Sequence, residues 1–230
     1  PYTGSCQATL AYWNLAKPGG LLDKKEFAPN GVRLLFTIVL PPYQVITRKP
    51  FASLKDLEGM KIRASGSAKE LLLKELKAVP VLMPTPEVYE SLSRGTIDGV
   101  LFPFNSLAPY GIDKLSKSGT IGSNFGSYVA NWVISEKRYQ SLPPALQKDL
   151  AAMGDELTRS VCKQVERDEA GDVDKTRAAG VQLKPLSPAD QQALEQVAAQ
   201  VATDWAQKLD RRGKSGTEVL NAFKAGLQAK

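Results

Sequence analysis

The sequence predicts an α/β fold in which a mostly parallel sheet is followed by long C-terminal helices. Three observations carry this prediction. Short apolar segments alternate with amphipathic segments between residues 31 and 135, glycine and proline separate most of them, and two long helix-forming segments follow residue 143. Strands that alternate with helices form βαβ units, whose strands lie parallel in one sheet.

The first elements are a helix and two extended segments. Residues 8–16 (ATLAYWNLA) have a helix-forming composition, and the sequence PGG at 18–20 ends that helix. Residues 31–40 (GVRLLFTIVL) are nearly all apolar and rich in branched side chains, which predicts a buried strand. Residues 43–47 (YQVIT) alternate and predict a second strand. Two prolines separate these strands, and there we expect the chain to cross between two lobes.

A strand, a helix and another strand follow. Residues 60–64 (MKIRA) predict a short strand, and residues 67–77 (SAKELLLKELK) predict an amphipathic helix. The apolar face of this helix is formed by Leu71, Leu72 and Leu76. Residues 79–83 (VPVLM) predict the next strand, so that this stretch forms one βαβ unit.

A second helix and strand continue the alternation. Thr85 offers a side chain for an N-cap, Pro86 fits the first helical position, and Glu87 suits the positive end of the helix. Gly95 supplies a left-handed stop, and residues 96–102 (TIDGVLF) begin another strand.

The remaining residues predict one more strand and two long helices. Residues 128–135 (YVANWVIS) form a long apolar strand. A helix then begins at the prolines 143–144 and continues past residue 170, and residues 187–210 form another. The C-terminal part is therefore helical.

Composition and charge exclude several classes of function. The net charge is +6, but the cations are scattered and most have acidic neighbours, so we expect no nucleic-acid partner. The chain has no histidine, which removes serine–histidine triads and histidine metal ligands. No apolar run reaches the ~20 residues of a membrane helix. We expect neither a cofactor nor a metal ion.

The two cysteines, Cys6 and Cys162, leave two alternatives open. They are too few for a thiolate zinc site, which needs about four ligands. In an oxidising compartment they would form one disulfide, and otherwise they would be two buried apolar thiols.

Four stretches resemble, in order and spacing, the substrate-binding proteins of tripartite ATP-independent periplasmic (TRAP) transporters of the dicarboxylate-binding type. They are SLKDLEGMKIRAS (53–65), PTPEVYESLSRGTIDGV (84–100), LFPF (101–104) and SEKRYQSLPPALQKDL (135–150). The first two are the most specific. The resemblance covers essentially all of the chain but corresponds to the C-terminal two-thirds of such a protein. The opening strands of the family have no counterpart here, so we expect an incomplete first lobe.

The resemblance implies a two-lobed, type II-like periplasmic binding protein that closes around a small organic acid and delivers it to TRAP membrane subunits. Residues 1–42 would then be the remainder of lobe I, and residues 43–126 would be lobe II. Residues 127–230 would form a crossing strand and C-terminal helices that both lobes share. We expect a monomer without enzymatic activity, located in the periplasm after removal of a signal peptide.

Arg63, which ends the motif GMKIR, is the residue that typically holds the ligand carboxylate in this family. A guanidinium presents a planar fork of donors that matches two carboxylate oxygens, and it stays charged when partly buried. The alternative is an exposed arginine at the end of a strand, and the surrounding match favours the ligand-binding role.

Two positions depart from the sialate-type pattern of the family. Phe102 stands where those members have an asparagine, and Tyr43 stands where they have an arginine, twenty positions before Arg63. Such a pocket loses hydrogen bonds to a multi-hydroxyl acid and gains flat apolar surface. We therefore expect an aromatic or branched monocarboxylate, with core packing as the alternative role of Phe102.

Three further residues are weaker candidates for the ligand site. Asn105 follows a strand end, where α/β folds place ligand contacts. Tyr128 begins the long strand, and its hydroxyl would reach an acid. Thr85 would donate a hydrogen bond to a ligand. Each has a structural alternative: a helix cap for Asn105 and Thr85, and a core ring for Tyr128.

Two other functions remain as alternatives. One is the ligand-sensing effector domain of a transcription regulator, which can share a two-lobed α/β fold. The other is a histidine-free lyase or hydrolase that uses lysine or carboxylate side chains, although no nucleophile elbow, paired-carboxylate motif or phosphate loop supports it.

Overall fold

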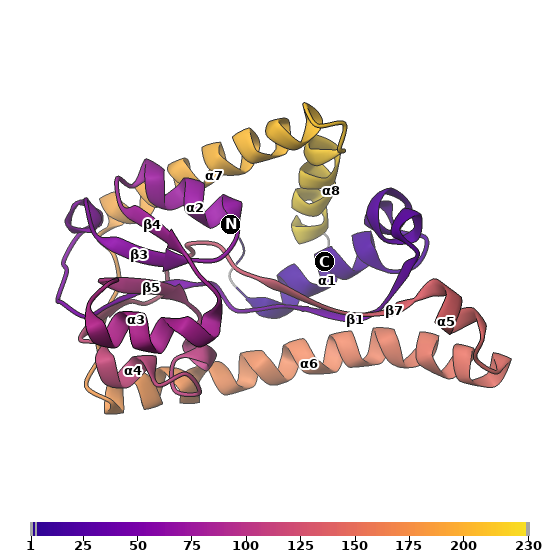
Figure 1. Cartoon of the computed structure of the whole chain (residues 1–230), viewed down its shortest axis with the longest axis horizontal. Coiled ribbons are helices and arrows are strands. Elements are labelled where there is room, and N and C mark those ends of the chain that lie inside the picture. Colours follow the sequence, from indigo (N-terminus) through magenta and orange to yellow (C-terminus); the bar gives the residue numbers. More distant parts are fainter. Residues whose placement is uncertain (1, 3, 229–230) are drawn as a thin grey trace. The chain divides into compact units, whose positions relative to one another are not determined.

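The computed structural model describes residue 2 and residues 4–228 (Figure 1). The helices are α1 (Ser5–Ala16), α2 (Ser67–Glu75), α3 (Val88–Arg94), α4 (Ile112–Leu115), α5 (Glu136–Gln140), α6 (Pro144–Ala178), α7 (Pro188–Asp210) and α8 (Gly216–Gln228). The strands are β1 (Val32–Val39), β2 (Gln44–Thr47), β3 (Lys61–Ala64), β4 (Val79–Leu82), β5 (Gly99–Phe102), β6 (Ser118–Thr120), β7 (Val129–Ser135) and β8 (Gln182–Lys184).

The described chain divides into two compact units. We call residues 41–127 and 168–204 the six-stranded unit, after its sheet. Residues 4–40, 128–167 and 205–228 lie in the other, which we call the two-stranded unit. Each unit is built from segments that are distant in sequence, so the tertiary fold brings them together.

The sheet of the six-stranded unit has the order β4-β3-β5-β2-β6-β8. Strand β3 is parallel to β4 and β5, and β6 is parallel to β8. Strand β2 is antiparallel to both of its neighbours. The α/β fold class is confirmed, while the sheet is mixed because β2 runs against the others.

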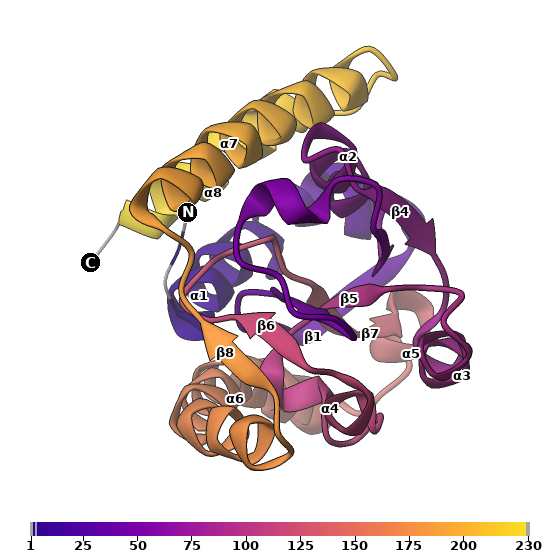
Figure 2. The ribbon, with the colours of Figure 1, turned by 90° about the vertical axis from the view of Figure 1, so that its left-hand side faces the viewer.

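Helices cover both faces of this sheet. Helix α2 links β3 to β4 in one direction along the sheet, and α3 links β4 back to β5 in the other. Right-handed crossovers in opposite directions place their helices on opposite faces. Figures 1 and 2 accordingly show α2 on one side of the sheet, with α3 and α4 on the other.

Each covering helix contributes apolar side chains to the core. Val88 and Leu92 of α3 and Ile112 of α4 pack with Ile46 and Val100 of the sheet. On α2 the buried residues are Lys69, Leu72 and Leu73. The predicted apolar face was thus partly wrong, because the helix ends at Glu75 and Leu76 lies beyond it.

The two-stranded unit is built around an antiparallel ribbon of β1 and β7. Helix α1 is anchored to β1 by the side chain of Thr9, which accepts a hydrogen bond from the amide of Val39 at 2.9 Å. On α6, a Cβ at Gly154 would lie 2.2 Å from the carbonyl oxygen of Leu35, so glycine permits this close approach. Four of the eight β1 residues are buried, which makes the strand less buried than predicted.

Cys6 on α1 and Cys162 on α6 form a disulfide, which decides between the two alternatives that the sequence left open. Both residues belong to the two-stranded unit, and 156 positions of sequence separate them. Disulfides persist in oxidising compartments. The bond therefore fits a protein that functions outside the cytoplasm.

We predict that replacing both cysteines, as Cys6→Ser with Cys162→Ser, lowers the free energy of unfolding by about 3–5 kcal/mol, because a long loop gains conformational entropy in the unfolded chain. Urea denaturation of the oxidised protein and the double variant measures this difference. As a control, a reducing agent should destabilise the wild type and leave the variant unchanged. Equal stability of the two oxidised proteins would contradict the prediction.

Candidate anion-binding site

Arg63 is the third residue of β3 and lies in the sheet between Val81 of β4 and Val100 of β5. Its residue surface is 3% exposed. The guanidinium donates from Nε and Nη2 to the carbonyl oxygen of Met83, at 3.2 and 3.0 Å. Nη2 also donates to the hydroxyl of Thr85 at 3.2 Å. The neutral partners hold the group in place without cancelling its charge.

Within residues 2 and 4–228, no carboxylate forms an ion pair with Arg63, and Nη1 has no hydrogen-bond partner. Burial lowers the pKa of the guanidinium, although an arginine stays charged in proteins. Buried charges are normally paired, because removing an ion from water costs several kcal/mol. An anionic ligand would supply the missing charge.

Three aromatic rings lie beside this cation. The guanidinium carbon of Arg63 is 4.8 Å from the centre of the Phe102 ring. Tyr110 stacks on Phe102 with ring centres 6.1 Å apart and planes at 6°. The Tyr43 ring is tilted against Phe102 at 6.4 Å. Sequence reasoning missed Tyr110, whose contact crosses an irregular loop that carries no periodic pattern.

The direction of β2 explains why Tyr43 reaches this group. Strand β2 is antiparallel to β5, with Gln44 opposite Phe102. The start of β2 therefore lies at the edge where β5 ends. Arg63 and Phe102 share a face of the sheet, because Arg63 is opposite Val100 and side chains alternate along a strand.

Lys69 is a second buried cation in this cluster, and sequence reasoning missed it. It lies in the first turn of α2 and is 7% exposed. Its Nζ donates to the carbonyl oxygen of Ser127 at 2.6 Å and lies 4.9 Å from the centre of the Tyr43 ring. Burial, and then the charge of Arg63, lower its pKa to about 8. Its segment, KELLLKELK, has the pattern of a solvent-exposed face.

The other predicted site residues have different positions. Thr85 accepts the bond from Arg63, and it caps no helix, because residues 85–87 form a 3-10 turn that runs into α3. Asn105 lies in a 3-10 turn after β5 and accepts a hydrogen bond from Ser106 at 3.2 Å. Tyr128 belongs to the two-stranded unit, where it is 51% exposed.

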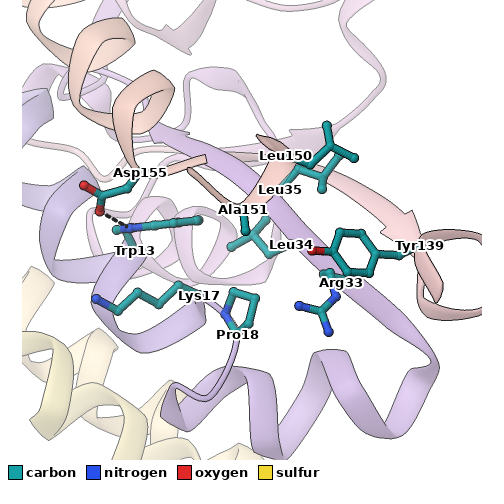
Figure 3. Close-up of a pocket in the computed structure, with 10 residues that line it drawn as sticks. All are labelled: Trp13, Lys17, Pro18, Arg33, Leu34, Leu35, Tyr139, Leu150, Ala151 and Asp155. Carbon is teal, nitrogen blue, oxygen red and sulfur yellow. Dashed lines mark hydrogen bonds between the residues drawn. The ribbon is translucent and has the colours of Figure 1, made fainter. Parts of the chain in front are cut away.

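A cavity of about 320 Å³ lies in the two-stranded unit, between α1, β1, α5 and α6 (Figure 3). Its charged groups already have partners within the unit. Arg33 forms a double hydrogen bond with Glu136 and covers the ring of Tyr139 at 4.2 Å. Asp155 accepts from the indole of Trp13 at 2.9 Å and also binds Arg159. The charges that line this cavity are therefore better compensated than the charge of Arg63, which makes the cavity a weaker candidate for binding an anion.

The described part of the chain shows neither a membrane-spanning helix nor a metal-binding cluster. No helix there is both long enough and apolar enough to pass through a membrane. Nor do its cysteine and acidic side chains gather in any group of three or more that would hold a metal ion.

Sheets of this kind, with polar side chains at the ends of their strands, are typical of proteins that bind small ligands. A model of the family described as bacterial extracellular solute-binding protein, family 7, matches residues 23–208. The chain belongs to this family. The resemblance that the sequence carries is thus confirmed, and with it a location outside the cytoplasm, in the periplasm.

One relative is the ectoine-binding periplasmic protein TeaA of Halomonas elongata, 25% identical over 96% of this chain and 64% of its own. The chain spans 51–64% of the length of the curated relatives it matches.

Solved structures share the fold over nearly the whole chain. A marine metagenome TRAP solute-binding protein specific for aromatic acid ligands, in complex with 3-hydroxybenzoate, has a TM-score of 0.86 at 22% identity, over 99% of this chain and 71% of that one. A TRAP solute-binding protein of Bordetella bronchiseptica with bound mandelate has a TM-score of 0.83 at 24% identity, over 99% and 72%. The two-lobed TRAP fold predicted from the sequence is confirmed.

We predict that Lys69 makes the stability of the protein rise with pH above about 8. Below pH 8 the lysine is charged in both the folded and unfolded states, and the cost of burying it is fully present. Between the folded pKa of about 8 and the unfolded value of 10.5, the unfolded state binds more protons, so stability increases with pH. The increase should approach about 3 kcal/mol.

Urea denaturation of the wild type and Lys69→Met from pH 7 to 10.5 isolates this effect, because other titrations cancel in the difference. Arg63 and Tyr43, which lie beside Lys69, are unchanged in both proteins. Lys74→Met on the same helix is the matched control, since Lys74 is exposed and paired with Glu70. A stability difference that does not vary with pH would contradict the prediction.

Proposed function

We propose that the protein captures a small organic acid outside the cytoplasm by its carboxylate and delivers it to the membrane subunits of a TRAP-type transporter. One observation carries the proposal. Arg63 is buried beside Phe102, and its donors meet neutral oxygens rather than an acid in the described chain. A carboxylate is the anion that matches the planar fork of a guanidinium.

The rings around Arg63 favour an apolar body for the rest of the ligand. Phe102, Tyr43 and Tyr110 offer flat apolar surface next to the cation. Such surface contributes hydrophobic and stacking energy for an aromatic or branched body, and it offers few hydrogen bonds for the many hydroxyls of a sugar acid. We infer an aromatic or branched aliphatic monocarboxylate.

The relatives support a ligand of this class. The marine metagenome protein is specific for aromatic acids, and the Bordetella bronchiseptica protein binds mandelate. TeaA binds ectoine, so the family takes more than one kind of ligand. The acid that this chain takes is therefore inferred from its own side chains.

We further propose that the protein acts as a monomer and returns its ligand unchanged. Family membership favours binding over the effector-domain and enzyme alternatives. Mass spectrometry of the acid recovered after long incubation distinguishes binding from turnover. A product of altered mass that forms in proportion to protein concentration would support an enzyme instead.

We predict that Arg63→Lys weakens binding of an aromatic monocarboxylate by about 1.5–3 kcal/mol, which is roughly a 10- to 150-fold rise in Kd. Lysine keeps the charge but loses the two-pronged geometry. Isothermal titration calorimetry measures the Kd. Arg94→Lys, at an exposed position on α3, is the control and should leave Kd unchanged. Unaltered affinity in Arg63→Lys would remove Arg63 as the anchor.

We predict that benzoate, phenylacetate and 3-methylbutanoate raise the melting temperature, whereas gluconate and sialate do not. A ligand at about 100 times its Kd stabilises the folded state by about 2.7 kcal/mol, which is about 5–10 °C for a chain of this size. A thermal-shift screen at matched concentrations makes the comparison. If only sugar acids raise the melting temperature, the assignment of an apolar ligand body is wrong.

A further inference from the structure

The position of Lys69 is electrostatically unfavourable in three ways at once. The ammonium is buried, which costs solvation energy. It lies near a second buried cation, Arg63, whose charge acts on it. It also occupies the first turn of α2, where the helix dipole disfavours positive charge. An anionic ligand at this place would be attracted by Lys69, by Arg63 and by the positive end of the α2 dipole, so it would offset all three costs.

The structure fixes this lysine firmly despite that cost. Its Nζ donates to the carbonyl oxygen of Ser127, and its stem passes Gly126, where a Cβ would come within 3.3 Å of Lys69 Cγ. The same loop holds the neighbouring ring, because the amide of Tyr43 donates to the carbonyl oxygen of Gly126 at 2.8 Å. The same loop therefore positions both Lys69 and Tyr43, and Tyr43 is one of the rings beside Arg63.

The two cations lie over different rings of one neighbouring pair. Arg63 lies over Phe102 at 4.8 Å, and Lys69 lies over Tyr43 at 4.9 Å. The centres of these two rings are 6.4 Å apart. The planar fork of Arg63 suits both oxygens of a carboxylate, whereas a lysine ammonium acts as a compact point charge that suits a single oxygen.

We propose that Lys69 is a second ligand anchor, which selects organic acids that carry a further oxygen acceptor besides the carboxylate held by Arg63. This inference rests on the proposed function and narrows its ligand class. The acceptor is a hydroxyl, a carbonyl oxygen or a second carboxylate on an otherwise apolar body. The lowered pKa of Lys69 in the free protein agrees with a site that gains from an incoming negative group.

Matched pairs of acids that differ by one hydroxyl test the proposal: mandelate against phenylacetate, and 3-hydroxybenzoate against benzoate. Calorimetry gives the ratio of the two Kd values in each pair. We expect the wild type to prefer the hydroxylated acid of at least one pair by about tenfold or more, the worth of one hydrogen bond to a charged group. In Lys69→Met that ratio should fall to about one, even though both affinities decrease with the lost charge.

Further variants keep the result interpretable. Lys69→Gln tests the same ratio if Lys69→Met fails to fold, which circular dichroism reports. Lys74→Met, at the exposed position on the same helix, should retain the ratio of the wild type. Arg63→Lys should weaken both members of a pair by a similar factor, because their common carboxylate is affected.

Two results would overturn the inference. One is a wild-type ratio of about one in both pairs, and the other is a preference that survives in Lys69→Met. In either case, binding that still depends on Arg63 leaves the proposed function intact. If no acid binds the wild type at all, the proposed function itself fails, and the inference fails with it.

Discussion

The local structure around the candidate site depends on one energetically unfavourable feature: the Arg63 guanidinium is buried, and no carboxylate of the described chain pairs with it. Its hydrogen bonds go to the carbonyl oxygen of Met83 and the hydroxyl of Thr85, both neutral groups. The ring of Phe102 adds a cation–π contact. These neutral partners orient the charge and leave it uncompensated, which is the condition under which a carboxylate gains most from entering.

Arg33 is a second arginine beside an aromatic ring, but its charge has an acidic partner. Arg33 also lies over an aromatic ring, that of Tyr139, and it lines a cavity. However, Glu136 accepts two hydrogen bonds from it, so its charge is balanced within the chain. Aromatic contact alone therefore does not distinguish a ligand anchor from a structural ion pair. The absence of an acid around Arg63 in the described chain is the distinguishing feature.

Sheet topology assembles the cluster. The parallel strands β3 and β5 bring Arg63 and Phe102 to one edge because their carboxyl ends lie side by side. Strand β2 runs in the opposite direction, so its beginning, with Tyr43, arrives at that same edge. Helix α2 then returns from β3 and carries Lys69 in its first turn. Within the six-stranded unit, β2, β3, β5 and α2 thus all contribute to one group of cations and rings.

The sequence by itself determined the α/β class and most helices and strands, and through a family motif it singled out Arg63, Phe102 and Tyr43 as candidates for the ligand site. These are local features: hydrophobic periodicity, glycine and proline stops, and the order of a few short stretches that resemble one family. Tertiary structure decided the antiparallel direction of β2, the pairing of Cys6 with Cys162, and the burial of Lys69. Each depends on which distant segment packs nearby. Lys69 lies in a helix that carries both acidic and basic side chains, and this local pattern gives no sign that a loop near residue 127 will cover it. Its burial, and the electrostatic consequences, therefore depend on the tertiary fold.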